Sequence, residues 1–169
     1  MKCFYELLVA DWILIAQPDT LICQDGDLPD FAYEYNFIGG TSFDLNDSMP
    51  LQYLRGEHSD NQTMNGGLSF RNRSRAVEMF DDKLFDHSNM AYLGSIEDHV
   101  WSKVANEKRP KRMEAALFSL NSCLSECLEI EGELRCPWGI HRANTCYMKT
   151  HSQRMIDHCP DIKNPQFSF

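Results

Sequence analysis

Cysteine and histidine recur every five residues near the end of the chain, at Cys136, His141, Cys146 and His151. Thiolate sulfur and imidazole nitrogen are typical zinc ligands, and zinc usually binds four such atoms in a tetrahedron. Four residues separate each of these cysteines from the next histidine, which is the upper limit of the short spacings found in zinc sites, and the chain has no C-x-x-C pair. One hypothesis is therefore a structural zinc site on these four residues.

The same region also has spacing that suits two disulfide bonds. Twelve residues separate Cys123 from Cys136, and twelve separate Cys146 from Cys159, on either side of a proline-glycine turn. This symmetry favours a nested arrangement, with Cys136 bonded to Cys146 beside the turn and Cys123 bonded to Cys159 at the open end. Each bond would stabilise a small hairpin by about 2–4 kcal/mol, largely by restricting the unfolded chain. A third possibility is that the thiols stay unlinked and buried, since free cysteine is a common core residue.

The residues around these cysteines show helical periodicity. Apolar side chains recur at helical spacing over residues 113–132, and a second helix is expected over about residues 142–158, after the helix-breaking sequence CPWG. Together they predict an αα-hairpin over about residues 111–159. Earlier in the chain, one helix is expected from Ser74 to about Met90 and another after Ser95.

The first part of the chain has a different composition. Residues 1–100 carry 6 basic and 17 acidic side chains, a net charge of -11, whereas residues 101–169 carry 10 basic and 8 acidic side chains, a net charge of +2. Turn-forming sequences such as QDGDLPD and NQTMNGG are frequent up to residue 73, and only short apolar runs such as FAYEYNFI lie between them. We therefore expect a mainly α fold, with an extended or irregular acidic region with short strands over residues 1–73 and a helical region over residues 74–169. The first region is expected to be an extended arm on a partner protein, and a small irregular sheet is the alternative.

The stretch from Cys123 to Cys159 resembles the twin cysteine-motif proteins of the mitochondrial intermembrane space, the coiled-coil-helix-coiled-coil-helix family. The resemblance covers about a quarter of the chain and implies two helices joined by nested disulfides. The family usually has nine residues between paired cysteines, whereas this chain has twelve. Ten and thirteen positions along a helix end on different faces, so Cys127 is an alternative to Cys123 for the outer bond.

The resemblance implies a non-catalytic accessory subunit of a large respiratory-chain type complex, located in the intermembrane space and peripheral to the membrane. Its partners would be protein subunits, bound by the stapled hairpin and by the N-terminal arm. Aromatic side chains of the arm would serve as anchors in partner grooves, or alternatively be buried in a small sheet of the chain's own fold; these are Phe31, Tyr33, Tyr35 and Phe37.

Several functions are disfavoured by the sequence. The formal net charge of -9 disfavours a nucleic-acid partner, because phosphate binding requires clustered Lys and Arg. The chain lacks the nucleophile-elbow, phosphate-loop and H-E-x-x-H motifs, so we expect no catalytic residues, no cofactor and no enzyme activity. The apolar N-terminal run is interrupted by Glu6 and Asp11 and fits neither a secretory signal nor a mitochondrial presequence.

Two alternatives to the accessory subunit remain open. One is a small zinc-stabilised interaction module, cytosolic or viral. The other is a secreted, disulfide-stabilised glycoprotein, which three N-glycosylation sequons at Asn46, Asn61 and Asn72 favour.

Overall fold

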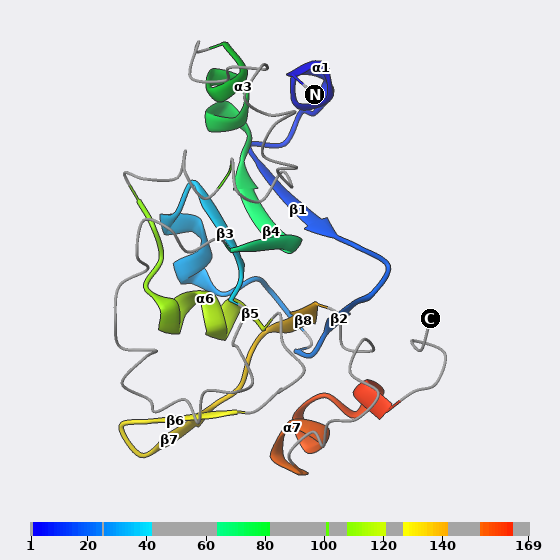
Figure 1. Ribbon diagram of the computed structural model, residues 1–169, viewed down its shortest axis with the longest axis vertical. Helices are drawn as coiled ribbons and strands as arrows, with labels where there is room; N and C mark the ends of the chain where they lie inside the picture. Colours follow the sequence, from blue (N-terminus) through cyan, green and yellow to red (C-terminus); the bar gives the residue numbers. More distant parts are fainter. Residues whose placement is uncertain are drawn as a thin grey trace, which may run out of the picture.

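Short strands gathered into sheets form the centre of the protein, seen here as a computed structural model (Figure 1). The structure describes residues 2–24, 26–41, 64–81, 101, 108–120, 127–141 and 153–163.

The first sheet has three antiparallel strands in the order β1-β4-β3. Strand β4 (Asn65–Asn72) lies between β1 (Trp12–Ala16) and β3 (Phe37–Gly40). Successive side chains of a strand point to opposite faces, and in β4 this alternation separates apolar residues from polar ones. Leu68 and Phe70 lie on one face, and Ser69 and Arg71 on the other.

Strands β3 and β4 of this sheet are buried on both faces. Leu68 and Phe70 belong to one apolar cluster with Phe118 and Trp138. Ile13 and Phe37 belong to another, which includes Tyr5, Met79 and Trp101. Strands that are buried on both faces carry apolar residues on both sides, and β3 accordingly carries no charged side chain. Strand β1 is also apolar, but it is an edge strand that exposes Leu14 and Ala16 on one face.

The second sheet has the order β2-β8-β5. Strand β8 (Gly139–His141) pairs antiparallel with β2 (Thr20–Ile22) and parallel with β5 (Ser119–Leu120). A parallel bridge between Thr41 and Leu120 joins this sheet to the end of β3. Strands β3, β5 and β8 therefore run in the same direction, and their carboxyl ends meet at one edge of the combined sheet.

The described helices are short and lie around the sheets (Figure 1). Helices α1 (Lys2–Leu7) and α3 (Arg73–Asp81) contact each other beside the first sheet, and α6 (Arg112–Phe118) packs on β3. Near the C-terminus, α7 (Gln153–His158) is followed by the 3-10 helix η3 (Pro160–Lys163). None of the helices in the described ranges is long and apolar enough to cross a membrane.

Arg71 of β4 is buried, with 1% of its surface exposed, and connects three parts of the fold. Its Nε donates to Ser69 Oγ at 2.9 Å, and its Nη1 donates to Tyr5 Oη of α1 at 3.0 Å. The guanidinium also lies over the rings of Phe37 and Trp101, at 5.6 and 5.2 Å from their centroids. Stacked and hydrogen-bonded arginine of this kind positions neighbouring elements, and we assign Arg71 a structural role.

The expected mainly α fold with a stapled helical hairpin is wrong. The helix expected over residues 113–132 ends at Phe118, because Ser119 adopts extended backbone and enters β5. Strands β6 (Leu128–Ile130) and β7 (Glu133–Arg135) then form an antiparallel hairpin. Glu131 and Gly132 turn this hairpin with φ of 54° and 81°. Two-residue β-hairpin turns require such positive φ angles, and glycine supplies one at little cost.

The expected N-terminal arm is also wrong. Strands β1 to β4 all come from residues 12–72, and they form the first sheet and one edge of the second. The aromatic residues expected to anchor partners lie within this fold: Phe37 is fully buried, whereas Tyr33 is 48% exposed. Short apolar runs between turns therefore build a sheet here by pairing with distant strands.

Two other helices begin or end differently from the prediction. The helix expected from Ser74 begins at Arg73, and the Oδ1 atom of Asn72 accepts a hydrogen bond from the Arg75 backbone N–H at 2.9 Å. Asparagine is a favoured N-cap because it satisfies such a free donor. Of the helix expected over residues 142–158, the structure describes α7. The rest of that helix and residues 82–90 of the helix expected from Ser74 lie outside the described ranges. Of the helix expected after Ser95, the structure describes only Trp101, which is helical and buried.

Candidate functional site

Polar side chains gather where the three parallel strands end. His141 is the last residue of β8, Thr41 follows β3, and the β1–β2 turn with Gln17 and Asp19 lies beside them, because Thr20 pairs with His141. In open α/β sheets, ligands bind outside the carboxyl ends of parallel strands. We call this region, defined by Gln17, Asp19, Thr20, Gly67 and His141, the carboxyl edge.

Two oxygen atoms face one nitrogen at the centre of the carboxyl edge. His141 Nε2 lies 2.9 Å from Gln17 Oε1 and 3.2 Å from Asp19 Oδ1. The His141 side chain is 1% exposed, whereas that of Asp19 is 31% exposed. The imidazole is therefore buried, and the Asp19 carboxylate beside it is in contact with solvent.

Gly67 shapes the floor of the edge. A Cβ atom at this position would overlap the imidazole ring of His141, so glycine is the residue that lets β4 lie against the ring. The Gly67 carbonyl accepts hydrogen bonds from the Gln17 backbone N–H at 2.8 Å and from Thr20 Oγ1 at 3.1 Å. Strand β4 and the β1–β2 turn thereby hold Gln17 and Asp19 in place around His141.

This donor set has a definite chemistry. A neutral imidazole carries at most one hydrogen on Nε2, so two acceptors compete for that single donor. One imidazole nitrogen with two oxygens also suits a divalent transition-metal ion. Among the described residues, no three His, Cys, Asp or Glu side chains form a metal-binding group, so the third donor here is the Gln17 amide oxygen.

The cysteine pairing in the structure differs from the expected one. Cys136 is bonded to Cys127 across the β6–β7 hairpin, and Cys159 is bonded to Cys23 beside β2. The expected partners Cys123 and Cys146 lie outside the described ranges. Sequence spacing did not indicate Cys23, because its separation from Cys159 is 136 residues and the two are brought together by β2 and α7.

The four expected zinc ligands do not come together as a set in the described residues. Cys136 is bonded in a disulfide and is therefore not available as a thiolate, and His141 binds Gln17 and Asp19 on the far side of β8. The other two expected ligands, Cys146 and His151, lie outside the described ranges. His141 is thus the one expected ligand that the structure places in a polar cluster with other donors.

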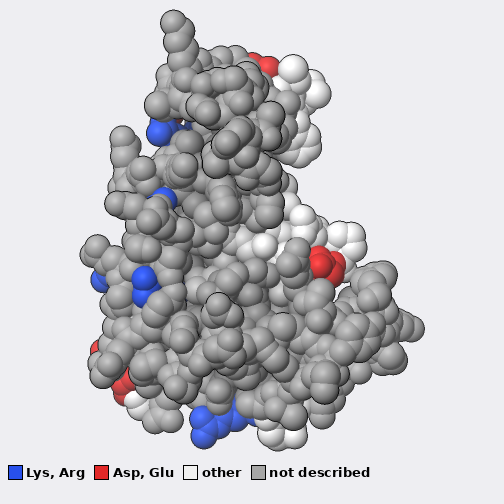
Figure 2. All heavy atoms as spheres, in the orientation of Figure 1, with Lys and Arg blue, Asp and Glu red and all other residues white. Residues whose placement is uncertain are grey.

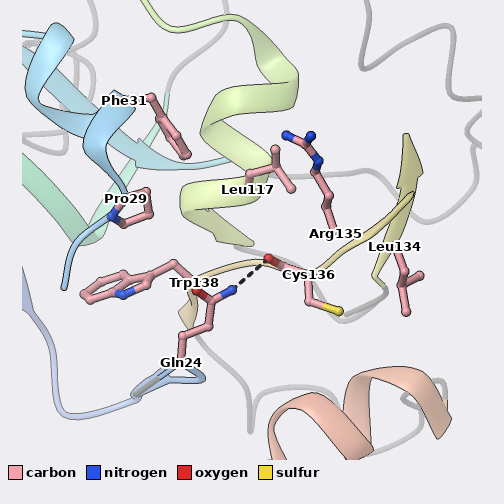
Figure 3. Close-up of a pocket in the computed structure, with 8 residues that line it drawn as sticks. All are labelled: Gln24, Pro29, Phe31, Leu117, Leu134, Arg135, Cys136 and Trp138. Atoms are coloured by element: carbon pink, nitrogen blue, oxygen red, sulfur yellow. Dashed lines mark hydrogen bonds between the residues drawn. The ribbon is translucent and has the colours of Figure 1, made fainter. Parts of the chain in front are cut away.

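A concave region lies at the other end of β8. A groove of about 300 Å³ is lined by residues of the β2–η1 connection, η1 (Asp30–Glu34), α6, β7 and the approach to β8 (Figure 3). The lining residues are Gln24, Pro29, Phe31, Leu117, Leu134, Arg135, Cys136 and Trp138.

Among the described residues on the face shown in Figure 2, the Lys and Arg side chains lie apart from one another and form no continuous basic patch. Near the groove, burial raises the pKa of Tyr35 above its ordinary value, and a hydrogen bond to Glu114 and the charge of that carboxylate raise it further. Tyr35 therefore stays protonated and ties the end of η1 to α6.

Comparison with known families places the chain. A family described as protein of unknown function (DUF5672) matches residues 1–141. The chain belongs to this family. The match spans the whole carboxyl edge and ends at His141, whereas α7 and Cys159 lie beyond it. Searches of curated proteins and of solved structures found no match.

Sequence reasoning missed Gln17 and Asp19. The short sequence QPD has the composition of a turn, and it forms one, since the Thr20 N–H donates to the Gln17 carbonyl at 3.0 Å. Polar residues directly after an apolar strand are a possible signal, because such positions lie at a sheet edge. That signal becomes specific only once His141, which is 124 residues away from Gln17, is known to lie opposite.

Proposed function

We propose that the chain is a disulfide-stabilised binding domain of an oxidising compartment, whose carboxyl edge binds a divalent transition-metal ion and, through it, a small anionic ligand. The observation that carries this proposal is the convergence of Gln17 Oε1 and Asp19 Oδ1 on the same nitrogen of His141.

The donor set supports a cation more strongly than a plain hydrogen bond. Gln17 and Asp19 both offer oxygen, and only one of them can accept a well-directed bond from Nε2–H. A cation bound among the three side chains uses the lone pair of Nε2 and one oxygen from each neighbour. The cation also neutralises the charge of the Asp19 carboxylate, in a chain whose formal net charge is -9.

Three protein donors leave coordination positions free. Metal sites with three protein ligands and an open position bind water or a substrate there. Asp19 is part-exposed and Gln17 is exposed, so the open positions face solvent. A carboxylate or phosphate oxygen is the natural occupant, because such oxygens bind divalent cations directly.

The two disulfide bonds support the proposed location in an oxidising compartment. Cys23–Cys159 and Cys127–Cys136 are formed, and disulfides persist mainly in oxidising environments such as the secretory pathway. The sequon at Asn72 agrees with this location, and its side chain is part-exposed at the junction of β4 and α3. The secreted glycoprotein is therefore the alternative from the sequence that we retain. The accessory-subunit hypothesis relied on the helical hairpin and the extended arm, which the fold replaces.

The cation is tested by calorimetric titration of the oxidised protein with Mn²⁺. Manganese is chosen over zinc because it does not favour thiolates, so the exposed free Cys3 does not compete. Asp19→Asn keeps the shape of the side chain and removes its charge, and we expect it to weaken binding by about tenfold or more. Asp27→Asn, at an exposed position of the β2–η1 connection, is the matched control and should bind like the parent.

Equal affinity of the parent and both variants for Mn²⁺ contradicts the cation site. The compartment is tested separately by peptide mapping without reductant, where peptides linked through Cys23–Cys159 and through Cys127–Cys136 are expected. Fully alkylatable thiols in the protein as isolated from its source would contradict the oxidising compartment without bearing on the cation.

A further inference from the structure

The groove at the amino end of β8 has one flat apolar side. Phe31 of η1 points toward Leu117 of α6, and Pro29 lies above the ring of Trp138 (Figure 3). Trp138 is 4% exposed and stacks on Phe118, with ring centroids 5.6 Å apart and planes at 21°. The indole is thereby fixed as a buried base, and the part-exposed side chains of Pro29, Phe31 and Leu117 supply the apolar surface that a ligand can contact.

The wall that carries Arg135 is the polar side of the groove. Among the eight described residues that line it, Arg135 is the only charged one. Its guanidinium extends beside Leu117 (Figure 3), and it pairs with Glu133 at 3.1 Å, where the two side chains are 53% and 71% exposed. Exposed ion pairs contribute little free energy, so Arg135 is free to exchange Glu133 for a ligand carboxylate at small cost.

The polar side is also held in place. Leu134, Arg135 and Cys136 are consecutive, and the Cys127–Cys136 disulfide closes the β6–β7 hairpin that carries them. Gln24 Nε2 donates to the Cys136 carbonyl at 3.4 Å, which connects this wall to the chain after β2 (Figure 3). The guanidinium is therefore presented from a covalently closed hairpin.

We propose that this groove binds a small ligand that combines a flat apolar body with a carboxylate. Its volume of about 300 Å³ is at the lower end of the range of ligand pockets, and such pockets combine an apolar lining with a few polar groups that fix orientation. The apolar body lies against Pro29, Phe31 and Leu117, next to the buried Trp138, and the carboxylate pairs with Arg135. The groove lies at the opposite end of β8 from His141 and does not depend on a cation at the carboxyl edge.

The test uses phenylacetate as the probe and phenylacetamide as its uncharged counterpart. The chain has three tryptophans, and the indole N–H signal of each is resolved by NMR after assignment with Trp→Phe variants. Phenylacetate should shift the Trp138 signal selectively, with a dissociation constant of roughly millimolar order for so small a ligand. Arg135→Gln should weaken phenylacetate about tenfold and leave phenylacetamide unchanged.

Arg154→Gln is the matched control, because Arg154 is an exposed residue of α7 and does not line the groove. It should bind both compounds like the parent. Three results would overturn the proposal: no shift of Trp138 with phenylacetate well above millimolar concentration, equal effects of Arg135→Gln on both compounds, or an equal loss in Arg154→Gln. Arg135 is exposed, so its variant is expected to fold.

Discussion

The two ends of β8 are built in different ways. At the carboxyl edge, His141 is held by hydrogen bonds to the β1–β2 turn and by the close approach of Gly67. At the amino end, Cys136 and the β6–β7 hairpin are held by a disulfide, and Cys23 ties the chain beyond β2 to α7. The carboxyl edge belongs to the tightly packed sheet. The second region, the β6–β7 hairpin and α7, consists of short elements with little apolar surface of their own.

This difference shows what each part needs in order to be stable. A buried polar cluster is positioned by close packing of the backbone around it. Adding a side chain where that backbone approaches, as at Gly67, therefore changes the geometry of the cluster. Short helices and isolated hairpins are marginal in water, and covalent bonds compensate for their small core. Substitutions that add bulk should therefore perturb the carboxyl edge, whereas reduction of the disulfides should destabilise the β6–β7 hairpin and α7.

The largest effect is expected from removing the Cys23–Cys159 bond. Its sequence separation is 136 residues, and restricting so long a loop in the unfolded chain is worth about 5 kcal/mol, against about 2.6 kcal/mol for the nine-residue separation of Cys127–Cys136. We expect double Cys→Ser variants to lower the free energy of unfolding in urea in this order. Equal losses, or a larger loss from the hairpin pair, would mean that loop length does not determine their contribution.

A smaller loss is expected when a methyl group is added at Gly67. Its Cβ would overlap the His141 ring, and forcing such an overlap costs about 1–3 kcal/mol in a packed interior. Gly132→Ala is the comparison from the second region, where no atom lies within contact distance but φ is +81°. That variant should lose only about 1 kcal/mol, through backbone strain. Urea unfolding measures both.

Gly67→Ala should also weaken Mn²⁺ binding, whereas Gly132→Ala should not. If Gly132→Ala proved the more damaging of the two for both properties, the contrast between the packed edge and the tethered hairpin would be lost.

The smallest effect concerns pH. Tyr35 has a raised pKa because of burial first and Glu114 second. Its phenol keeps its proton in the folded protein while unfolded tyrosine loses it near its ordinary value of 10.0. This contribution to stability is complete below that pH and declines as pH rises above it.

Tyr35→Phe should therefore flatten the loss of stability between neutral and strongly alkaline pH, as followed by urea unfolding at a series of pH values. Tyr33→Phe, at an exposed position in the same segment, is the control and should unfold like the parent. The same alkaline slope in both variants would show that the contact between η1 and α6 does not depend on the Tyr35 proton.

Local signals in the sequence predicted part of the fold. The helix starting next to Ser74 follows from a cap and a periodic run that lie within a few residues of each other. The turn at Glu131 and Gly132 was noticed as the end of a helix, but its role in a β-hairpin depends on strands on both sides. Helical spacing over residues 113–132 was outweighed because Ser119 and Leu120 pair with β8.

The candidate site was predicted less well. His141 was selected because it lies in a row of cysteine and histidine, and that spacing implied ligands on the same stretch of chain. Its actual neighbours come from the β1–β2 turn. Likewise, Cys159 pairs with Cys23 because β2 and α7 lie together. Contacts of this kind are set by strand order, which spacing along one segment does not determine.

The most direct test of the account is anomalous diffraction from crystals of the oxidised protein grown or soaked with Mn²⁺. The account predicts one strong anomalous peak at the carboxyl edge, within coordination distance of His141 Nε2 and of oxygens of Asp19 and Gln17. The peak should be absent in Asp19→Asn crystals treated in the same way. A well-ordered edge without a peak in the parent protein, with His141 still bonded directly to Gln17, would contradict it.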